Sequence, residues 1–344
     1  MQQALFERNI SMLTESIIDV RYPDCDPMGI VHHGVYPIWY EIARMDYFAG
    51  VGYSYTDMNQ EGINPPMVNF NLNYHSPVRY PGRVTVRTVC TLCQGKKLEL
   101  RYGVYQEGNS APVATATSFH IWTGPDMKSL NMSTKPEIYE KLRNAVESPA
   151  VLILAGGQSR RMGRDKATVS LEGQTLLNRA VEFWKKALPG APIYVSAGSP
   201  EHFDTLPQDV TPIYDLQPQK GPMGGLQAAF RQIPQELLWV SAVDMPLLNQ
   251  EALELLNKNR CHCEDACVFT RDGHAEPLFG LYRNTCLQEI EAMLSQGDNR
   301  MTALLSRLRT TLVPLKQADW VCNVNTPEDM EALKETLGKS AKKV

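Results

Sequence analysis

The sequence predicts two domains of different fold class: an α+β domain in residues 1–148 and an α/β domain in residues 149–344. At 344 residues the chain is long for one core, since domains average roughly 150 residues. Before residue 148, apolar residues alternate with a period of two, which is typical of an antiparallel sheet with one covered face. After it, short continuous apolar runs alternate with amphipathic helices, which indicates parallel strand–helix units.

One helix is predicted early in the first domain, at residues 35–50. Apolar residues recur there at helical spacing, and Gly50 and Gly52 end the pattern. Because one apolar helix comes before a long run of strands, we expect the antiparallel sheet to wrap round it. The stripe that we expect to face the sheet is Val35, Ile38, Trp39, Ile42, Met45 and Ala49.

Three alternating stretches then predict strands, with turns at QGKK and EGNS, and a last helix follows at residues 135–146. In each stretch every second residue is apolar or small, so we expect these residues to share the covered face. The sets are Val84, Val86, Thr88, Cys90 and Leu92; then Leu98, Leu100, Tyr102 and Val104; then Val113, Thr115, Thr117, Phe119 and Ile121.

The second domain is predicted to hold a parallel sheet with helices on both faces. Strands are expected at residues 151–155, 192–198 and 237–244, and helices at 174–188 and 224–233. Ligands of such sheets bind beyond the carboxyl ends of the strands. Residues that follow strands are therefore the candidates for a site.

Composition excludes several classes of protein. The chain is 43% hydrophobic and 21% charged with a net charge of −4, and this mild acidity argues against nucleic-acid binding. We find no apolar stretch near the ~20 residues of a membrane span. The polar start MQQALFERNI also lacks a signal-peptide core. We therefore expect a cytoplasmic protein whose eight cysteines are free thiols.

One group of cysteines requires a separate interpretation. In RCHCEDACVF, Cys261, His262, Cys263 and Cys267 give the spacing C-x-C-x3-C, which is unlike common structural zinc sites. A loop that leads into the strand ACVFT is the favoured interpretation, and a metal site is the alternative.

The loop LAGGQSRRMGRDK follows the first strand of the second domain, at residues 154–166. Paired glycines allow the backbone to approach a ligand closely, so that N–H groups can face phosphate oxygens. The loop matches neither GxxxxGK[ST] nor GxGxxG, and a solvated basic loop is the alternative interpretation. The glycines are Gly156 and Gly157, and the cations are Arg160, Arg161, Arg164 and Lys166.

Two carboxylates follow other predicted strands. Asp244 comes directly after LLWVSAV, and Asp215 precedes the glycine loop GPMGGL. A buried carboxylate needs a counter-charge, and Mg²⁺ takes one or two protein carboxylates together with substrate phosphates. Helix capping or another structural role is the alternative for each aspartate.

These segments, with HAEPLFGLY and CNVNTPEDM in the same order, resemble molybdenum cofactor guanylyltransferases over about residues 150–338. The resemblance implies a Rossmann-like nucleotidyltransferase domain. It would transfer GMP from Mg-GTP to the terminal phosphate of molybdopterin or Mo-molybdopterin and release pyrophosphate. By motif, Leu154, Ala155 and Gly156 would contact the nucleotide, Lys166 its phosphates, Asp215 the guanosine part and Asp244 the magnesium ion.

Further positions follow from the same resemblance. Asn323 and Asn325 match positions near the reacting groups, and Arg300 matches a basic position that would face the pterin. Where the family often has an asparagine after the second strand, this chain has Ser196 or Gly198. Another nucleotidyltransferase, of the nucleotide-sugar or cytidylyl type, remains the alternative.

The first domain has its own dense group of polar residues, RYPDCDPMGIVHHGVYPIWYEIAR, at residues 21–44. Asp24 and Asp26 follow a strand, Gly29 permits a tight turn, and His32 and His33 precede the helix. The free N–H groups at a helix start can stabilise an oxyanion. A nearby carboxylate can attack a thioester or activate water. Turn and capping residues are the structural alternative.

This segment, with PPMVNFNLNYHSPVRYPGRVTV, resembles hotdog-fold acyl-CoA thioesterases of the 4-hydroxybenzoyl-CoA type over about residues 15–142. The resemblance implies that Asp26 is catalytic, that His33 precedes the central helix, and that the substrate is an acyl-CoA. His32 replaces the family's tyrosine. The resemblance also implies a homo-oligomer formed through this domain. A non-catalytic acyl-CoA-binding module or a dimerisation module is the alternative.

Overall fold

The computed structural model describes residues 13–156, 166–197, 206–217, 219–317, 320, 322–326 and 328–334. The chain divides into two compact units. The first consists of the described residues up to Glu147 together with Arg260–Glu264, and the second of the other described residues from Ser148 onward. The division lies next to the expected boundary. The membership of Arg260–Glu264 in the first unit is not predicted by the sequence.

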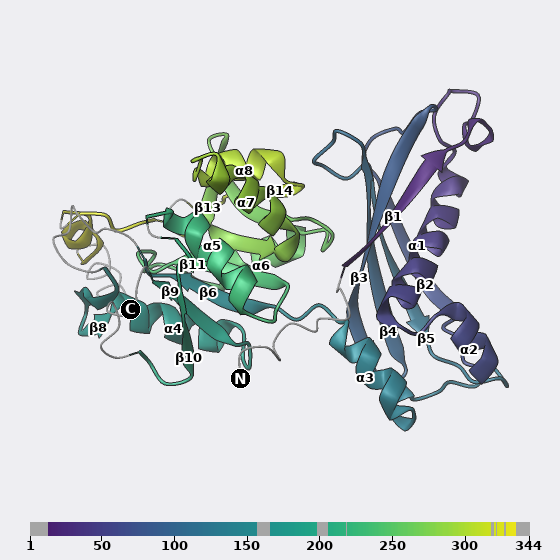
Figure 1. Cartoon of the computed structure of the whole chain (residues 1–344), viewed down its shortest axis with the longest axis horizontal. Helices are drawn as coiled ribbons and strands as arrows, with labels where there is room; N and C mark the ends of the chain where they lie inside the picture. The colour runs from purple at the N-terminus through teal and green to yellow at the C-terminus, as the bar shows by residue number, and fades with distance from the viewer. Residues whose placement is uncertain are drawn as a thin grey trace. The chain divides into compact units, whose positions relative to one another are not determined.

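The first unit is an antiparallel sheet that packs against the central helix α1 (Figure 1). Its strand order is β1-β3-β4-β5-β2, so β1 and β2 form the two edges in the described chain. The strands are β1 (Leu13–Val20), β2 (Met67–Tyr74), β3 (Gly82–Gln94), β4 (Lys97–Gln106) and β5 (Ala114–Ile121), and the helices are α1 (Tyr36–Val51), α2 (Tyr55–Glu61) and α3 (Pro136–Asn144). The fold class expected from the sequence is confirmed.

The face of α1 that enters the core differs from the expected stripe. Ile38, Ile42 and Met45 are 50%, 41% and 47% exposed. Trp39 is buried as expected. The buried face is a neighbouring stripe, also at helical spacing, formed by Tyr36, Trp39, Tyr40, Ala43, Tyr47, Phe48 and Val51. The aromatic rings bury more apolar area than the aliphatic side chains would, so they decide which face of the helix turns inward.

The expected strand faces are confirmed for β4, almost confirmed for β3, and wrong for β5. In β3 a bulge between Cys90 and Leu92 puts Cys93 in the core in place of Leu92. In β5 the covered face carries Ala114, Ala116, Ser118 and His120, while Phe119 is 37% exposed. Successive side chains of a strand point to opposite faces, so an error of one residue assigns the whole expected set to the wrong face. Val113, which precedes β5 and is buried, is the exception.

A buried chain of polar groups explains the small and polar face of β5. His120 Nδ1 lies 2.8 Å from the carbonyl oxygen of Pro65, so Nδ1 carries the proton and donates. His120 Nε2 then accepts from the Ser118 hydroxyl at 2.8 Å, and the Tyr102 hydroxyl lies 3.0 Å from Ser118 Oγ. Burial, which the nearby Arg44 reinforces, lowers the pKa of His120 to about 4, although its hydrogen bond to Pro65 opposes this.

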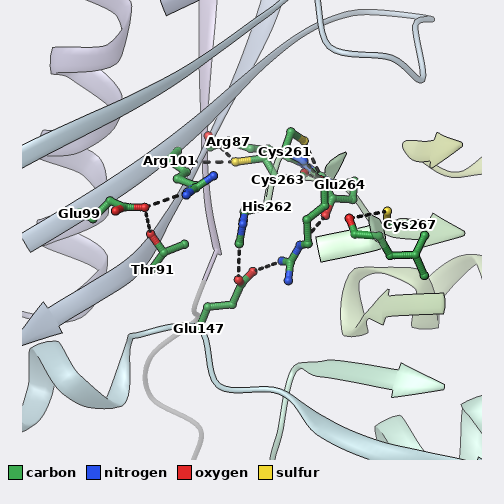
Figure 2. Close-up of polar contacts among 12 residues, drawn as sticks. Arg87, Thr91, Glu99, Arg101, Glu147, Cys261, His262, Cys263, Glu264 and Cys267 are labelled. Carbon is green, nitrogen blue, oxygen red and sulfur yellow. Dashed lines mark hydrogen bonds and ion pairs between the residues drawn. The ribbon is translucent and has the colours of Figure 1, made fainter. Parts of the chain in front are cut away.

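Arg260–Glu264 is fixed within the first unit by buried ion pairs, which Figure 2 shows. Arg260 Nη2 lies 2.6 Å from Glu147 Oε1, and Arg260 Nε lies 3.2 Å from Glu264 Oε1. His262 Nδ1 contacts the other Glu147 oxygen at 2.7 Å. Arg260 therefore has the carboxylates of Glu147 and Glu264 as partners, as burial of its charge requires.

The cysteines of the same segment pack on the sheet. Cys263 is fully buried with Leu13, Val89 and Tyr105, and Arg87 Nη1 donates to its carbonyl oxygen at 3.0 Å. Burial raises the pKa of the Cys261 thiol well above its ordinary value, and the adjacent Glu264 raises it further. A neutral thiol is a poor metal ligand. No cluster of three candidate metal ligands occurs among the described residues. Cys267 lies in a strand of the second unit, within the expected ACVFT stretch.

The second unit is built on a mixed sheet of order β10-β9-β6-β11-β13-β12-β14 within the described chain. The neighbours β10, β9, β6 and β11 are parallel as expected, but β13 runs antiparallel to both β11 and β12. The strands are β6 (Ala150–Leu154), β9 (Ile193–Ala197), β10 (Val210–Tyr214), β11 (Leu237–Ala242), β12 (Ala266–Arg271), β13 (His274–Arg283) and β14 (Thr310–Pro314). The short strands β7 (Ser170–Leu171) and β8 (Gln174–Thr175) pair separately.

Helices cover both faces of this sheet, as the sequence predicts. Val151 and Ile153 of β6 belong to one apolar cluster with α4 and α6, whereas Leu152 and Leu154 belong to another with α5, α7 and α8. Both faces are therefore buried, which explains the continuous apolar run of β6. The helices are α4 (Leu176–Ala187), α5 (Gly221–Gln232), α6 (Gln250–Asn259), α7 (Leu287–Ser295) and α8 (Met301–Arg307), and residues 328–334 are also helical.

Candidate functional site

The segments singled out in the second unit meet at the carboxyl edge of its parallel strands. A series of backbone hydrogen bonds connects these segments to one another. Ala155 N–H donates to Ser196 O at 2.9 Å, and Val243 N–H donates to Leu154 O at 3.0 Å. Val324 N–H then donates to Asp244 O at 2.9 Å. Motifs as far apart in sequence as Leu154 and Val324 thus form one edge, as expected for an α/β ligand site.

Asp244 and Asn323 place side-chain oxygens at this edge. Asp244 follows β11 and is 8% exposed. Asn323 lies in the segment that is hydrogen-bonded to Asp244, and its buried Oδ1 accepts no hydrogen bond within the described chain. A buried carbonyl oxygen without a donor is costly, and it fits a cation or a ligand N–H group. The oxygens of both residues are of the type that Mg²⁺ prefers.

Asp215 lies beside β9 and α5. Its N–H donates to Ala197 O at 3.2 Å, and its Oδ1 accepts from the Ser196 hydroxyl at 3.3 Å. A Cβ atom at Gly224 would lie 3.7 Å from Asp215 Oδ2. GPMGGL, expected from the sequence to be a loop, forms the first turns of α5, and Gly224 lets the helix pass close to this acid.

The remaining candidates of the basic loop are only partly described. Gly156 is half-buried after β6. Gly157, Arg160 and Arg161 lie outside the described residues. Lys166 begins a 3-10 turn, Lys166–Thr168, but its side chain is also outside the description. Their expected contacts with a nucleotide stay predictions.

Arg300 is exposed and forms an ion pair with Asp298 at 2.7 Å. Hydrogen bonds from Arg300 hold the pKa of Asp298 well below its usual range. The intervening Asn299 side chain donates to Lys220 O at 3.4 Å, which fixes the Arg300 turn next to the loop before α5. Its expected contact with a pterin stays a prediction.

Part of the NVNTPED motif has a structural explanation. Asp329 Oδ2 accepts from the N–H groups of Asn325 and Thr326 at 2.8 and 2.9 Å, and Asp329 N–H donates to Thr326 Oγ1 at 3.2 Å. This reciprocal pattern is a capping box at the start of the helix at residues 328–334. Thr326 and Asp329 therefore fix the turn that presents Asn323 and Asn325.

A cavity of about 360 Å³ lies on the second unit between α4 and the turn after Asp244. Met245 and Pro246 form one wall, and Arg179, Lys186 and Glu182 contribute charges of both signs. None of the described residues that the sequence predicts to contact the nucleotide lines this cavity, so the triphosphate is not assigned to it.

In the first unit, Asp26 is held in a turn before α1. Its Oδ1 accepts from the N–H of Met28 at 2.8 Å and from that of Ile30 at 3.5 Å. Among the described residues, no donor reaches its Oδ2. Asp26 is half-buried, so one oxygen fixes the carboxylate while the other can act on a substrate.

Asp24 has a different role from Asp26. It is buried, and Arg21 binds it through the guanidinium at 2.8 Å and through its N–H at 2.9 Å. Burial raises the pKa of Asp24, but the bonds from Arg21 outweigh this, so the pKa lies below its ordinary value. Asp24 is thus an ionised structural residue.

His32 and His33 lie together at the start of α1. His32 Nδ1 accepts from Gly34 N–H at 3.1 Å and caps the 3-10 turn His33–Val35 that leads into the helix. The two imidazole rings lie 4.0 Å apart, and His33 O accepts from the Tyr74 hydroxyl at 2.9 Å. His32, which replaces the expected tyrosine, has a structural function, and both histidines are exposed.

Comparison with known proteins finds a matching family model for each half of the chain. A family model described as "MobA-like NTP transferase domain" matches residues 151–312, and one described as "Thioesterase-like superfamily" matches residues 20–145. The "Probable molybdenum cofactor guanylyltransferase" of Synechococcus elongatus is 34% identical over 194 residues, which cover 54% of this chain and 97% of that protein. The chain belongs to the molybdenum cofactor guanylyltransferase family.

Similar solved structures are found for both halves. Molybdopterin-guanine dinucleotide biosynthesis protein A from Archaeoglobus fulgidus is 27% identical, with a TM-score of 0.48, covering 55% of this chain and 99% of that one. The DHNA-CoA thioesterase from Staphylococcus aureus is 30% identical, with a TM-score of 0.36, covering 38% of this chain and 91% of that one. The family membership rests on the curated relatives and the family model that match the second half, and the thioesterase-like family model matches the first half.

None of the helices in the described chain is long and apolar enough to cross a bilayer.

Proposed function

We propose that the second unit transfers GMP from Mg-GTP to the terminal phosphate of molybdopterin or Mo-molybdopterin. The observation that carries this proposal is the hydrogen-bonded edge that joins Leu154, Ser196, Asp244 and Val324. It brings together the nucleotide, metal and acceptor motifs of the family at the place where such sheets bind ligands.

The reaction needs no protein nucleophile. An oxygen of the acceptor phosphate attacks the α-phosphorus of GTP, the bond from that phosphorus to the bridging oxygen breaks, and pyrophosphate leaves. The acceptor phosphate is already an anion near neutral pH, so the site must mainly neutralise charge and align the two groups. In this proposal, Asp215 binds the guanosine part, and Lys166, Arg160 and Arg161 bind the phosphates.

Asp244 and Asn323 are the residues that would hold Mg²⁺. The fit rests on two oxygen donors on adjoining segments, one of them the buried Asn323 Oδ1. When bound, the ion would supply positive charge for the polyphosphate. Asn325, on the turn fixed by Asp329, would help to orient the acceptor.

The direct test uses the full chain with GTP, magnesium and molybdopterin-loaded carrier. We expect the guanine dinucleotide and pyrophosphate to form in equal amounts, and CTP and ATP to be poor substitutes. Efficient use of CTP or of a sugar phosphate acceptor instead would support another nucleotidyltransferase. GTP binding without transfer to any acceptor would contradict the proposal.

We propose further that the first unit hydrolyses an acyl-CoA thioester. Asp26 supports this, because backbone N–H groups fix one oxygen of its carboxylate and leave the other to attack a thioester or activate water. The full chain should hydrolyse at least one thioester in a broad acyl-CoA panel. Binding without hydrolysis would instead support an acyl-CoA-binding or dimerisation module.

We also propose that the chain forms a homo-oligomer through the first unit in the cytoplasm. The edge strand β2 supports pairing with a second copy, since its backbone has a neighbour, β5, on one side only in the described chain and its side chains are largely exposed. Light scattering of the full chain tests this. A monomer at micromolar concentration would contradict it.

A further inference from the structure

Ser196 lies where three segments of the nucleotide edge meet. It is the fourth residue of β9 and is 2% exposed. Its carbonyl oxygen accepts from Ala155 N–H at 2.9 Å, and its hydroxyl donates to Asp215 Oδ1 at 3.3 Å. One residue thus connects the loop after β6 with the acid after β10.

Close packing confines the Ser196 side chain. A Cβ atom at Gly225 of α5 would lie 2.7 Å from Ser196 Oγ and 2.8 Å from Leu154 Cδ2. Such distances are shorter than a carbon contact allows, so α5 approaches this closely only because residue 225 is glycine. The hydroxyl has little room to rotate away, and Asp215 is the partner that it meets.

We propose that Ser196 is a positioning residue that orients the Asp215 carboxylate toward the nucleoside of the bound nucleotide. This inference rests on the proposed guanylyl transfer. A hydrogen bond to one carboxylate oxygen restricts rotation of the group, so less freedom is lost when a ligand binds.

The chemistry of the carboxylate defines what Asp215 recognises. An ionised carboxylate only accepts hydrogen bonds, so its ligand must present N–H or O–H donors. A guanine nucleoside offers the N1–H and 2-amino group on the base and the hydroxyls on the sugar. Inosine triphosphate lacks the 2-amino group and 2′-deoxy-GTP lacks one hydroxyl. These two analogues therefore test whether the base amino group or the 2′-hydroxyl donates to Asp215.

The test is a double-mutant cycle on the full chain, with KM and kcat measured for GTP. Ser196→Ala should raise the KM for GTP about three- to tenfold, the size of one hydrogen bond, and leave kcat within about twofold. Asp215→Ala should raise the KM further. Adding Ser196→Ala to Asp215→Ala should have no extra effect, because the residue acts through Asp215.

Ser241→Ala is the matched control. Ser241 is also a buried strand serine, and its hydroxyl accepts from Trp184 Nε1 at 2.8 Å within the apolar core. Ser241→Ala should lower thermal stability about as much as Ser196→Ala does, while leaving the KM for GTP unchanged. Equal KM changes in both variants would show a general loss of stability and overturn the proposal.

The analogues complete the design. If Asp215 contacts the base amino group, the Ser196→Ala effect should shrink with inosine triphosphate; if it contacts the 2′-hydroxyl, the effect should shrink with 2′-deoxy-GTP. An unchanged KM in Ser196→Ala, or additive effects in the double variant, would overturn the inference. If the wild type fails to transfer GMP, the same double-mutant cycle can be carried out on Kd values for GTP measured by calorimetry. Absence of GTP binding would overturn both proposals.

Discussion

The two units place their candidate acids in different surroundings. Asp244 of the second unit is 8% exposed and lies two residues after a fully buried strand. Asp26 of the first unit is half-buried in a turn, where backbone N–H groups bind one of its oxygens. The backbone N–H groups of the turn orient the Asp26 carboxylate without any other charged side chain. Asp244 adjoins the oxygen of Asn323 and is suited to a shared cation.

The difference shows that burial of a charge does not by itself identify a functional site. Asp24 and Arg260 of the first unit are at least as buried as Asp244, yet each is matched by an opposite charge. These pairs stabilise the fold. What distinguishes the edge of the second unit is the convergence of oxygens from separate motifs.

The largest effect is expected for Asp244→Asn. Removing the charge that would hold magnesium should reduce guanylyl transfer about 100- to 1000-fold, the scale of losing one charge-stabilising group. Thioester hydrolysis by the same preparation is the control and should not change. Transfer within about tenfold of the wild type would remove Asp244 from the metal site.

Asp26→Asn should reduce thioester hydrolysis about 100-fold or more, because a carboxylate nucleophile or base contributes on this scale. Asparagine can still accept the turn hydrogen bonds from Met28 and Ile30, so the fold should be kept. GMP transfer by the variant is the control here. If hydrolysis persists, Asp26 is only a turn residue.

Glu147→Gln should lower the free energy of unfolding by about 3 kcal/mol, since it breaks a buried ion pair and leaves Arg260 short of one negative charge. Asp19→Asn is the matched control. It breaks the exposed pair of Asp19 with Arg83 at 2.7 Å and should change stability by less than about 1 kcal/mol. Denaturant unfolding measures both, and equal losses would show that burial of the Glu147 pair is unimportant.

The smallest effect concerns pH. His120 has a folded pKa of about 4, below the value of about 6.5 in an unfolded chain. The unfolded state therefore binds the proton first, and stability falls as the pH drops through this interval. Between pH 7 and pH 5 the loss from His120 should be about 2 kcal/mol. His120→Gln should flatten this part of the stability profile; an identical profile would contradict the assignment.

The sequence predicted the second unit better than the first, for a physical reason. Strands buried on both faces, such as β6, are apolar throughout, so their faces need not be distinguished. In β5 only one face enters the core, and the polar chain through Ser118 and His120 occupies it. Hydrophobicity then favours Phe119, which is on the wrong side. Similarly, α1 offers two apolar stripes, and only packing against the sheet selects the aromatic one.

For the candidate site, the sequence predicted positions near strand ends. Leu154, Asp215 and Asp244 lie at strand ends because the pattern of strands determines those positions. The orientation of Asp215 by Ser196 was not predictable, because it depends on the close approach of Gly225. Nor did any pattern indicate that Arg260–Glu264 belongs to the first unit, since ion pairs between residues so distant in sequence leave no periodic signal.

That five-residue segment has a consequence for how the protein can be divided. Severing the polypeptide after residue 148 would leave Arg260–Glu264 on the other fragment. Glu147 would lose its contacts with Arg260 and His262, and Leu13, Val89 and Tyr105 would be exposed to water. The first half of the sequence is therefore not a complete folding unit by itself. An excised thioesterase-like half would need Arg260–Glu264 restored by a graft or supplied as a peptide.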